Sequence, residues 1–236
     1  MKTMSPPINP SPPALAASAW KPGDKIEHPV GAMTSIDISK LAPHEAYRLL
    51  ITGIVPRPIA FVSTCNAAGV INLAPFSFYC GVASNPPCLA ISIARKPDGT
   101  KKDTLRNIEE TNEFVVNSAH DWIAGPLVHC AASYPYGVDE MSKVGLTPLA
   151  SLRVRPPRVT ESAVHYECEF YKSVEVGDGG PGSSTLVLGK VVHCHASSHI
   201  YENGKIDFTR LHPLARLGGI SYSLLGDIFE LEIPRV

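Results

Sequence analysis

The stretch VINLAPFSFYCG, residues Val70 to Gly81, decides the fold of this 236-residue chain. Strand-forming residues open and close it, but its centre is Asn72-Leu73-Ala74-Pro75. Proline has no N–H to donate to a neighbouring strand, so it occurs at sheet edges and bulges. We therefore predict a strand over 70–81 that stops pairing at residues 72–75. The main-chain groups freed there need another partner if they are buried.

Further strands flank this stretch on both sides. Residues 57–64 are β-branched and apolar, and the turn CNAAG (65–69) predicts a hairpin between them and 70–81. Turns and alternating patterns then predict a hairpin at ENG (202–204) and strands over 88–95, 113–119, 164–174 and 185–197. Short strands at regular turn spacing, with few helices, predict a single, mainly β domain built as an antiparallel barrel.

Four short helical segments are predicted between the strands. They are 41–53, with Pro43 in its first turn; 101–112, with Asp103 as N-cap; 121–132, interrupted at Gly125-Pro126; and one turn near Met141. Residues 1–35 are rich in proline and lack periodicity, so we expect an N-terminal arm outside a domain that spans 36–236.

Composition excludes several classes of function. Apolar residues make up 44% and charged residues 18%, the net charge is −1, and no run of Lys or Arg suggests nucleic acid binding. No apolar run reaches the roughly 18 residues that span a bilayer, and the N-terminus lacks the apolar core of a signal peptide. The six cysteines form no C-x-x-C pair. We therefore expect a cytoplasmic protein with reduced, buried thiols.

The interrupted strand and a basic loop together favour a flavin nucleotide. Unpaired main-chain donors and acceptors at 72–75 suit the polar edge of a flat heteroaromatic ring such as a flavin. Arg95, Lys96, Lys101 and Lys102 lead into the helix over 101–112, and a helix N-terminus favours phosphate. Asp103 argues partly against this, because a carboxylate competes for the same amides, unless it caps the helix and orients a lysine.

Each of these features also has a simpler interpretation. NLAPFS alone is compatible with a bulged barrel corner, and the basic residues with a solvated loop. Arg57 either reaches an anion or lies on the surface at a strand start. His193 and His195 share one strand face while Cys194 points to the other, so only two ligands converge and a metal site is disfavoured. No G-x-S-x-G motif supports a serine hydrolase. Cys80 and Cys194 lack a resolving partner in the sequence, so we expect buried structural thiols.

Taken together, the motifs resemble a known family. NLAPFS, KDT and RLGG-x-x-Y, in that order and within residues 40–225, are similar to the flavin reductase-like, flavoredoxin-type family of FMN-binding split barrels. The resemblance implies an antiparallel Greek-key FMN-binding split barrel. It also implies a homodimer with FMN in a groove at or near the dimer interface.

The resemblance also implies which residues contact the cofactor. The NLA triplet is implied to meet the isoalloxazine edge, and the KDT triplet the ribityl chain and phosphate. Segment 133–145 matches the family weakly. The implied contact residues are Ser63, Thr64, Asn72, Leu73, Ala74, Ser77, Ser92, Lys102, Asp103, Thr104, Arg216 and Tyr222.

Three functions follow from this resemblance. The first is an NADH- or NADPH-dependent FMN oxidoreductase, in which hydride passes from the nicotinamide to flavin N5. One form of this function is the reductase partner of a monooxygenase. The second is an FMN electron carrier reduced by a redox protein partner. The third is a non-catalytic flavin-binding protein. Hydride transfer between stacked rings needs no side-chain base, so no catalytic residue is assigned.

Overall fold

The computed structural model describes residues 21–25 and 32–233, of which Lys40–Leu225 form one compact unit. Of the predicted N-terminal arm, residues 1–20 and 26–31 lie outside the described residues, and 21–25 and 32–35 are exposed without helix or strand. Within the described residues, no helix has the length and apolar character that crossing a membrane requires.

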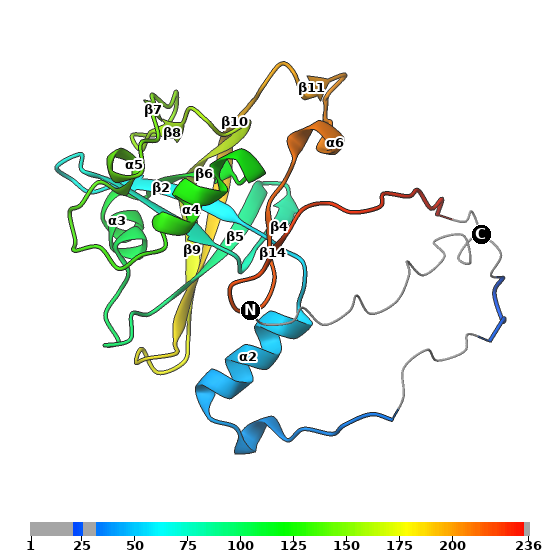
Figure 1. The fold of residues 1–236 in the computed structure, drawn as a ribbon. Coiled ribbons are helices and arrows are strands. Elements are labelled where there is room, and N and C mark those ends of the chain that lie inside the picture. Colours follow the sequence, from blue (N-terminus) through cyan, green and yellow to red (C-terminus); the bar gives the residue numbers. More distant parts are fainter. Residues whose placement is uncertain (1–20, 26–31, 234–236) are drawn as a thin grey trace, which may run out of the picture. The chain divides into compact units, whose positions relative to one another are not determined.

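The protein is mainly antiparallel β, as predicted, with one large sheet at its centre (Figure 1). The sheet has the order β3-β2-β6-β9-β10-β5-β4. Its strands are β2 (Ala60–Cys65), β3 (Ile71–Phe76), β4 (Tyr79–Ser84), β5 (Pro87–Ala94), β6 (Glu113–Ser118), β9 (Val164–Val176) and β10 (Ser184–Ala196).

Shorter elements surround this sheet. β1 (Arg57–Pro58) pairs with β13 (Ala215–Arg216), and β13 pairs with β14 (Tyr222–Ser223). Two small hairpins are β7 (Pro148–Leu149) with β8 (Arg158–Val159), and β11 (Tyr201–Glu202) with β12 (Lys205–Ile206). The helices are η1 (Ile38–Lys40), α2 (Pro43–Gly53), α3 (Asp103–Thr111), η2 (Asp121–Ile123), α4 (Ala124–His129), α5 (Glu140–Lys143) and α6 (Phe208–Leu211).

The predicted strand over 70–81 is two strands, and the predicted break at 72–75 is wrong. β3 pairs with β2 at every residue from Ile71 to Phe76, so the change of partner comes at Ser77-Phe78, before β4. Leu73 points its N–H away from β2, to Glu140. Pro75 lies two residues further and faces the same outer edge, so its missing N–H costs no bond to β2.

The short link between β3 and β4 closes the barrel. These strands stand at opposite ends of the sheet order but are joined only by Ser77 and Phe78. The sheet must therefore curl until its two ends meet, and the Ser92 N–H donates to the Phe78 carbonyl at 2.9 Å at this seam. The polypeptide changes from one end of the sheet to the other without a long loop.

β2 is buried on both faces and separates two apolar cores. Ala60 and Val62 face the core inside the barrel, where Phe114 is fully buried. Phe61, between them, faces a second core with residues of α4 and α5. The period of two along a strand produces this alternation. α3, α4 and α5 consequently pack around β2 and β3 (Figure 1).

One helical prediction needs correction. Residues 121–129 form η2 and then α4, so the change of helix lies between Ile123 and Ala124 and not at Gly125-Pro126. Pro126 falls in the first turn of α4, where its missing N–H is not needed. The predicted helices near Pro43 and Met141 are confirmed as α2 and α5.

Candidate functional site

A cavity of about 600 Å³ lies where β3 meets the start of α3, and we call it the α3 cavity. Its volume falls within the roughly 300–1,000 Å³ typical of small-molecule sites. Its walls come from β3, the loop after β5, the start of α3 and the segment around α5. The lining residues are Asn72, Ala74, Pro75, Ala94, Arg95, Lys96, Pro97, Asp98, Lys102, Asp103, Thr104, Cys130, Ala131, Ala132, Ser133, Tyr134 and Glu140.

The first turn of α3 is free to bind an anion. Lys102, and not the predicted Asp103, is the N-cap, and no side chain caps the helix. The first main-chain N–H groups of the helix therefore remain available. Asp103 forms an ion pair with Lys96, with Nζ and Oδ1 2.8 Å apart. The carboxylate thus orients a lysine, as one of the two sequence interpretations proposed, although it does not cap the helix.

Lys102 supplies a positive charge to the cavity. Burial lowers the pKa of its ammonium group, the nearby Lys96 lowers it further, and Asp103 opposes both effects. Its Nζ lies 5.9 Å from the centroid of the Phe76 ring. Among the described residues, no carboxylate lies within ion-pair distance of it. A partly desolvated cation without an acidic partner favours an anionic ligand.

A buried hydrogen-bond network fixes the floor of the α3 cavity. The Asn72 side-chain amide nitrogen donates to the hydroxyls of Thr64, at 3.1 Å, and Thr104, at 3.0 Å. Asn107 donates to the same Thr64 hydroxyl. The amide oxygen of Asn72 is therefore the end left for a ligand. The Thr104 hydroxyl accepts from Asn72 and keeps its own hydrogen to donate.

Sequence reasoning missed Glu140, which lines the α3 cavity together with the start of α3. It opens α5, is 6% exposed, and accepts the outward N–H of Leu73 at 3.1 Å through Oε2. Burial is the main cause that raises the pKa of its carboxyl group. Its only signal in the sequence was the helical turn predicted near Met141, in a segment without clear periodicity.

Three other predicted residues gather around Arg57 instead. Arg57 is 4% exposed and donates to the carbonyls of Ile51, Ile54 and Leu217 at 2.5–2.7 Å. It therefore ties the end of α2 to the RLGG segment, and the interpretation of Arg57 as a surface residue is wrong. The predicted residues that lie around it are Ser77, Arg216 and Tyr222, and we call this set the Arg57 cluster.

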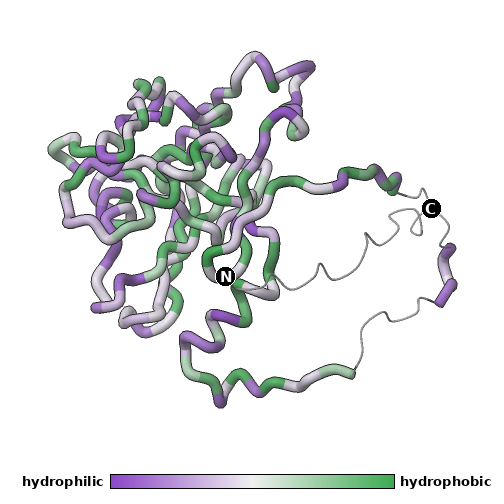
Figure 2. The backbone as a smooth tube through the Cα atoms, in the orientation of Figure 1, coloured by the Kyte–Doolittle hydropathy of each residue, from purple (hydrophilic) through white to green (hydrophobic). Residues whose placement is uncertain are grey.

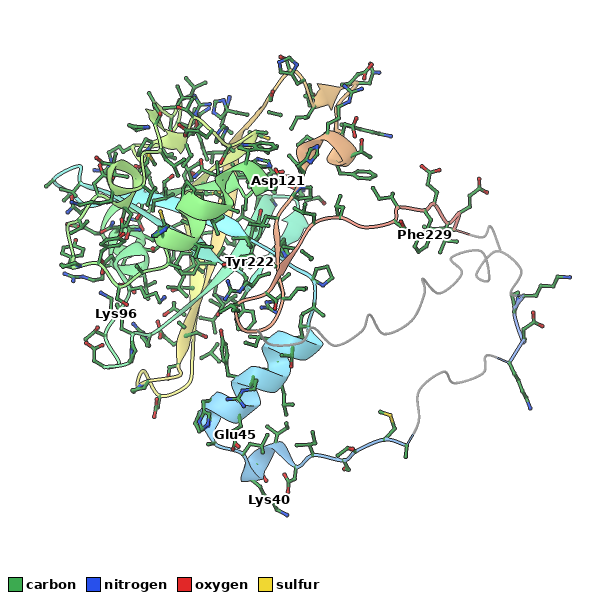
Figure 3. All side chains as sticks on the ribbon, in the orientation of Figure 1. Lys40, Glu45, Lys96, Asp121, Tyr222 and Phe229 are labelled. Carbon is green, nitrogen blue, oxygen red and sulfur yellow. The ribbon has the colours of Figure 1, made fainter. Side chains whose placement is uncertain are left out.

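Within the Arg57 cluster, Ser77 and Arg216 have defined partners. The Arg57 Nε donates to the Ser77 hydroxyl at 3.4 Å. The Arg216 guanidinium stands 4.4 Å from the Tyr222 ring centroid and donates to its hydroxyl. Figure 3 shows Tyr222 well apart from Lys96, which lies in the loop at the α3 cavity. The structure thus divides the predicted contacts between two places, joined by β3.

Ser63 and Ser92 lie at neither place. The Ser63 hydroxyl donates to the Pro157 carbonyl at 2.5 Å and accepts from Asn117, so it faces away from Thr64. Ser92 lies within β5, opposite Leu186 of β10. Leu73 takes part through its main chain, because its side chain is fully buried in the second core.

The other reactive side chains have structural surroundings. Within the described residues, no group of three or more His, Cys, Asp or Glu side chains is placed to hold a metal ion. His193 and His195 share a face, with ring centroids 4.5 Å apart, and His195 pairs with Glu167 at 2.6 Å. All six thiols are free, but Cys80 and Cys194 are exposed, which corrects the expectation that they are buried.

Comparison with known proteins decides the family. Residues 52–214 match the model of the flavin reductase like domain. This chain belongs to the flavin reductase-like family. Membership implies a flavin cofactor, and the residues of the α3 cavity fit one that carries a phosphate. They offer a cation that has no acidic partner among the described residues, a hydroxyl donor and the free N–H groups of a helix start.

Individual relatives agree with the family match. Nitrilotriacetate monooxygenase component B from Bacillus cereus is 37% identical, covering 86% of this chain and 100% of its own, with a TM-score of 0.82. An uncharacterized protein of Halalkalibacterium halodurans is 39% identical over 83% of this chain and 94% of its own length. A Shewanella frigidimarina protein with a split barrel domain, 20% identical with a TM-score of 0.71, shows the same fold.

Proposed function

We propose that this flavin reductase-like protein binds FMN with its phosphate in the α3 cavity. The observation that carries the proposal is Lys102, a partly buried cation at the start of α3 without a carboxylate partner among the described residues. Lys102 and the first N–H groups of α3 hold the phosphate, and Thr104 donates its hydroxyl hydrogen. A phosphate at a helix start gains from both the free donors and the helix dipole.

We place the flavin ring along the outer edge of β3. This edge leads from Asn72, at the α3 cavity, towards Ser77, in the Arg57 cluster. The amide oxygen of Asn72 and the main chain through Ala74 face the polar edge of the ring. The Arg57 cluster, with Arg216 and Tyr222, then borders the far end of the groove.

The proposed activity is an NADH- or NADPH-dependent flavin reductase. Bound FMN supplies the two-electron chemistry, because its N5 accepts a hydride from a nicotinamide. The chain's own residues orient the flavin and limit the access of water, and none needs to act as a base. The likeness to a monooxygenase component B supports a monooxygenase as the partner that uses the reduced flavin.

The reaction is tested by mixing the purified chain with FMN and either NADH or NADPH. We expect one of the two nucleotides to be oxidised at a rate that depends on both chain and FMN. If FMN binds but neither nucleotide reduces it at a useful rate, the reductase proposal fails. Reduction by a redox protein alone would then identify an electron carrier, and no reduction at all a non-catalytic flavin protein.

The phosphate site is tested by comparing two neighbouring lysines. Replacing Lys102 by Met should weaken FMN at least about tenfold, because a charge-assisted hydrogen bond is lost, and leave riboflavin within about twofold. Lys101→Met is the matched control, since Lys101 pairs with Glu109 at 2.7 Å, away from the cavity lining. Equal losses for FMN and riboflavin, or equal effects of the two variants, would refute the assignment.

A further inference from the structure

Most charged side chains that line the α3 cavity already have a partner. Lys96 pairs with Asp103, and Arg95 pairs with Glu175 at 2.6 Å. The Asp98 carboxylate accepts the N–H and hydroxyl of Thr100 at 2.9 and 2.6 Å. Lys102 and Glu140 remain, and within the described part of the chain neither forms an ion pair. The phosphate proposed above gives Lys102 a partner of opposite charge, but it gives Glu140 none.

Glu140 is a buried carboxylate with few donors. Oε2 receives the Leu73 N–H, and the only other donor to the group among the described residues is its own main-chain N–H. No side chain of the described residues donates to it. A carboxylate offers about four acceptor positions, and these two main-chain donors fill two of them. Burial is the main cause that raises the pKa of this carboxyl group, and the two main-chain hydrogen bonds lower it.

A ligand that supplies hydroxyl groups would satisfy this carboxylate. A second phosphate would not, because it would place an anion in direct contact with the carboxylate. A nicotinamide or flavin ring edge offers few donors compared with a chain of hydroxyls. The cavity therefore combines a cation for one phosphate with an acceptor for neighbouring hydroxyls.

We propose that Glu140 is the residue of the α3 cavity that recognises the polyhydroxylated chain next to the ligand phosphate, by accepting a hydrogen bond from one of its hydroxyls. This inference rests on the proposed function, since it names the ligand as an alkyl polyol phosphate. The same carboxylate holds the outer edge of β3 through Leu73. Ligand recognition and the shape of the cavity wall thus share one side chain.

The test uses three flavins that differ in one part each. Lumiflavin has the ring alone, riboflavin adds the polyol, and FMN adds the phosphate. Affinities are measured by fluorescence titration for the unmodified chain and for Glu140→Gln. The glutamine oxygen keeps the Leu73 contact, so the variant is expected to fold, which circular dichroism checks. Asp98→Asn is the matched control, because it removes an equal charge from the cavity lining while Asp98 is already satisfied by Thr100.

We expect Glu140→Gln to weaken riboflavin and FMN alike, by about tenfold, and to leave lumiflavin within about twofold. Asp98→Asn should leave all three unchanged. The inference is overturned if Glu140→Gln weakens lumiflavin as much as riboflavin, or if it leaves riboflavin unchanged. It is also overturned if Asp98→Asn weakens the flavins as much as Glu140→Gln does. Each of these outcomes is compatible with FMN binding that depends on Lys102. If the unmodified chain binds no flavin, the proposed function fails together with this inference.

Discussion

Burial holds the pKa of His165 down at about 4, compared with its ordinary value of 6.5. The ring is 6% exposed, and its Nε2 lies 2.8 Å from the Val159 carbonyl, so Nε2 carries the hydrogen. Nδ1 is buried and has no hydrogen-bond partner in the part of the chain that the structure describes. Protonation of Nδ1 in the folded protein therefore creates a charge without compensation.

This histidine makes stability depend on pH. Between pH 6.5 and about 4 the unfolded chain binds a proton at His165 and the folded chain does not. The free energy of unfolding should thus fall as the pH drops through this window, by about 3 kcal/mol from His165. Urea unfolding at a series of pH values, for the unmodified chain and His165→Gln, measures the difference. Burial also lowers the pKa of His120. Because His120 is present in both proteins, its contribution cancels in the difference between them. If the free energy of unfolding changes with pH in the same way in both proteins, His165 does not titrate as stated.

Single residues were predictable from the sequence where a motif fixes them locally. Lys102 and Thr104 follow a basic loop at a helix start, and both line the α3 cavity. Glu140 and Arg57 were not predictable, because their partners are main-chain groups far along the sequence or in another element. The Glu140 contact with Leu73 joins residues 67 apart. No local pattern records such a pairing.

At the scale of the elements, Gly189 shows why β10 needs a glycine. Its position coincides with a register shift in the pairing of β10 with β9. A Cβ at this position would overlap the ring of Phe114, which is fully buried in the barrel core. The close approach of the two strands to this ring requires a residue without a side chain.

Gly189→Ala should therefore destabilise the fold by about 1–3 kcal/mol, because the methyl group overpacks the core. Gly81→Ala in β4 is the control, since a Cβ there meets open space. Chemical denaturation of both variants gives the two changes in the free energy of unfolding. If both glycines tolerate alanine equally, the overlap with Phe114 does not limit the packing of β10.

The kinds of elements were largely predictable from the sequence, and their partners were not. Alternation and turn residues located β9, β10 and the β2–β3 hairpin correctly, but the predicted hairpin over 57–81 also included residues that belong to β1 and β4. The prediction at Asn72–Pro75 failed because a proline shows that one N–H is missing but not which side of the strand it faces. Pro75 faces the outer edge, so β3 pairs without a break.

For the whole molecule, the surface of α2 suggests a homodimer. Hydrophobic and hydrophilic positions alternate along this helix (Figure 2), yet none of its residues is buried. Leu50, at 52% exposed, and Tyr47, at 54%, lie on it, and Ile54 follows at 55%. Apolar side chains of this size, exposed together on one element, are typical of an interface.

We expect the unmodified chain to be a dimer and the double variant Leu50→Glu, Ile54→Glu to be a monomer, because two buried charges oppose association. Light scattering after size-exclusion chromatography measures both masses. Replacing the exposed Leu152, which lies outside α2, by Glu should leave the dimer intact. A monomeric unmodified chain would contradict the expectation.

The central claim is that FMN lies between β3 and the start of α3, and hydrogen–deuterium exchange with and without FMN tests it most directly. We expect bound FMN to slow the exchange of the main-chain amides of residues 103–105 and of the outer edge of β3. Exchange in the distant β11–β12 hairpin should stay the same. Slower exchange confined to other segments, or no change at saturating FMN, would contradict the claim.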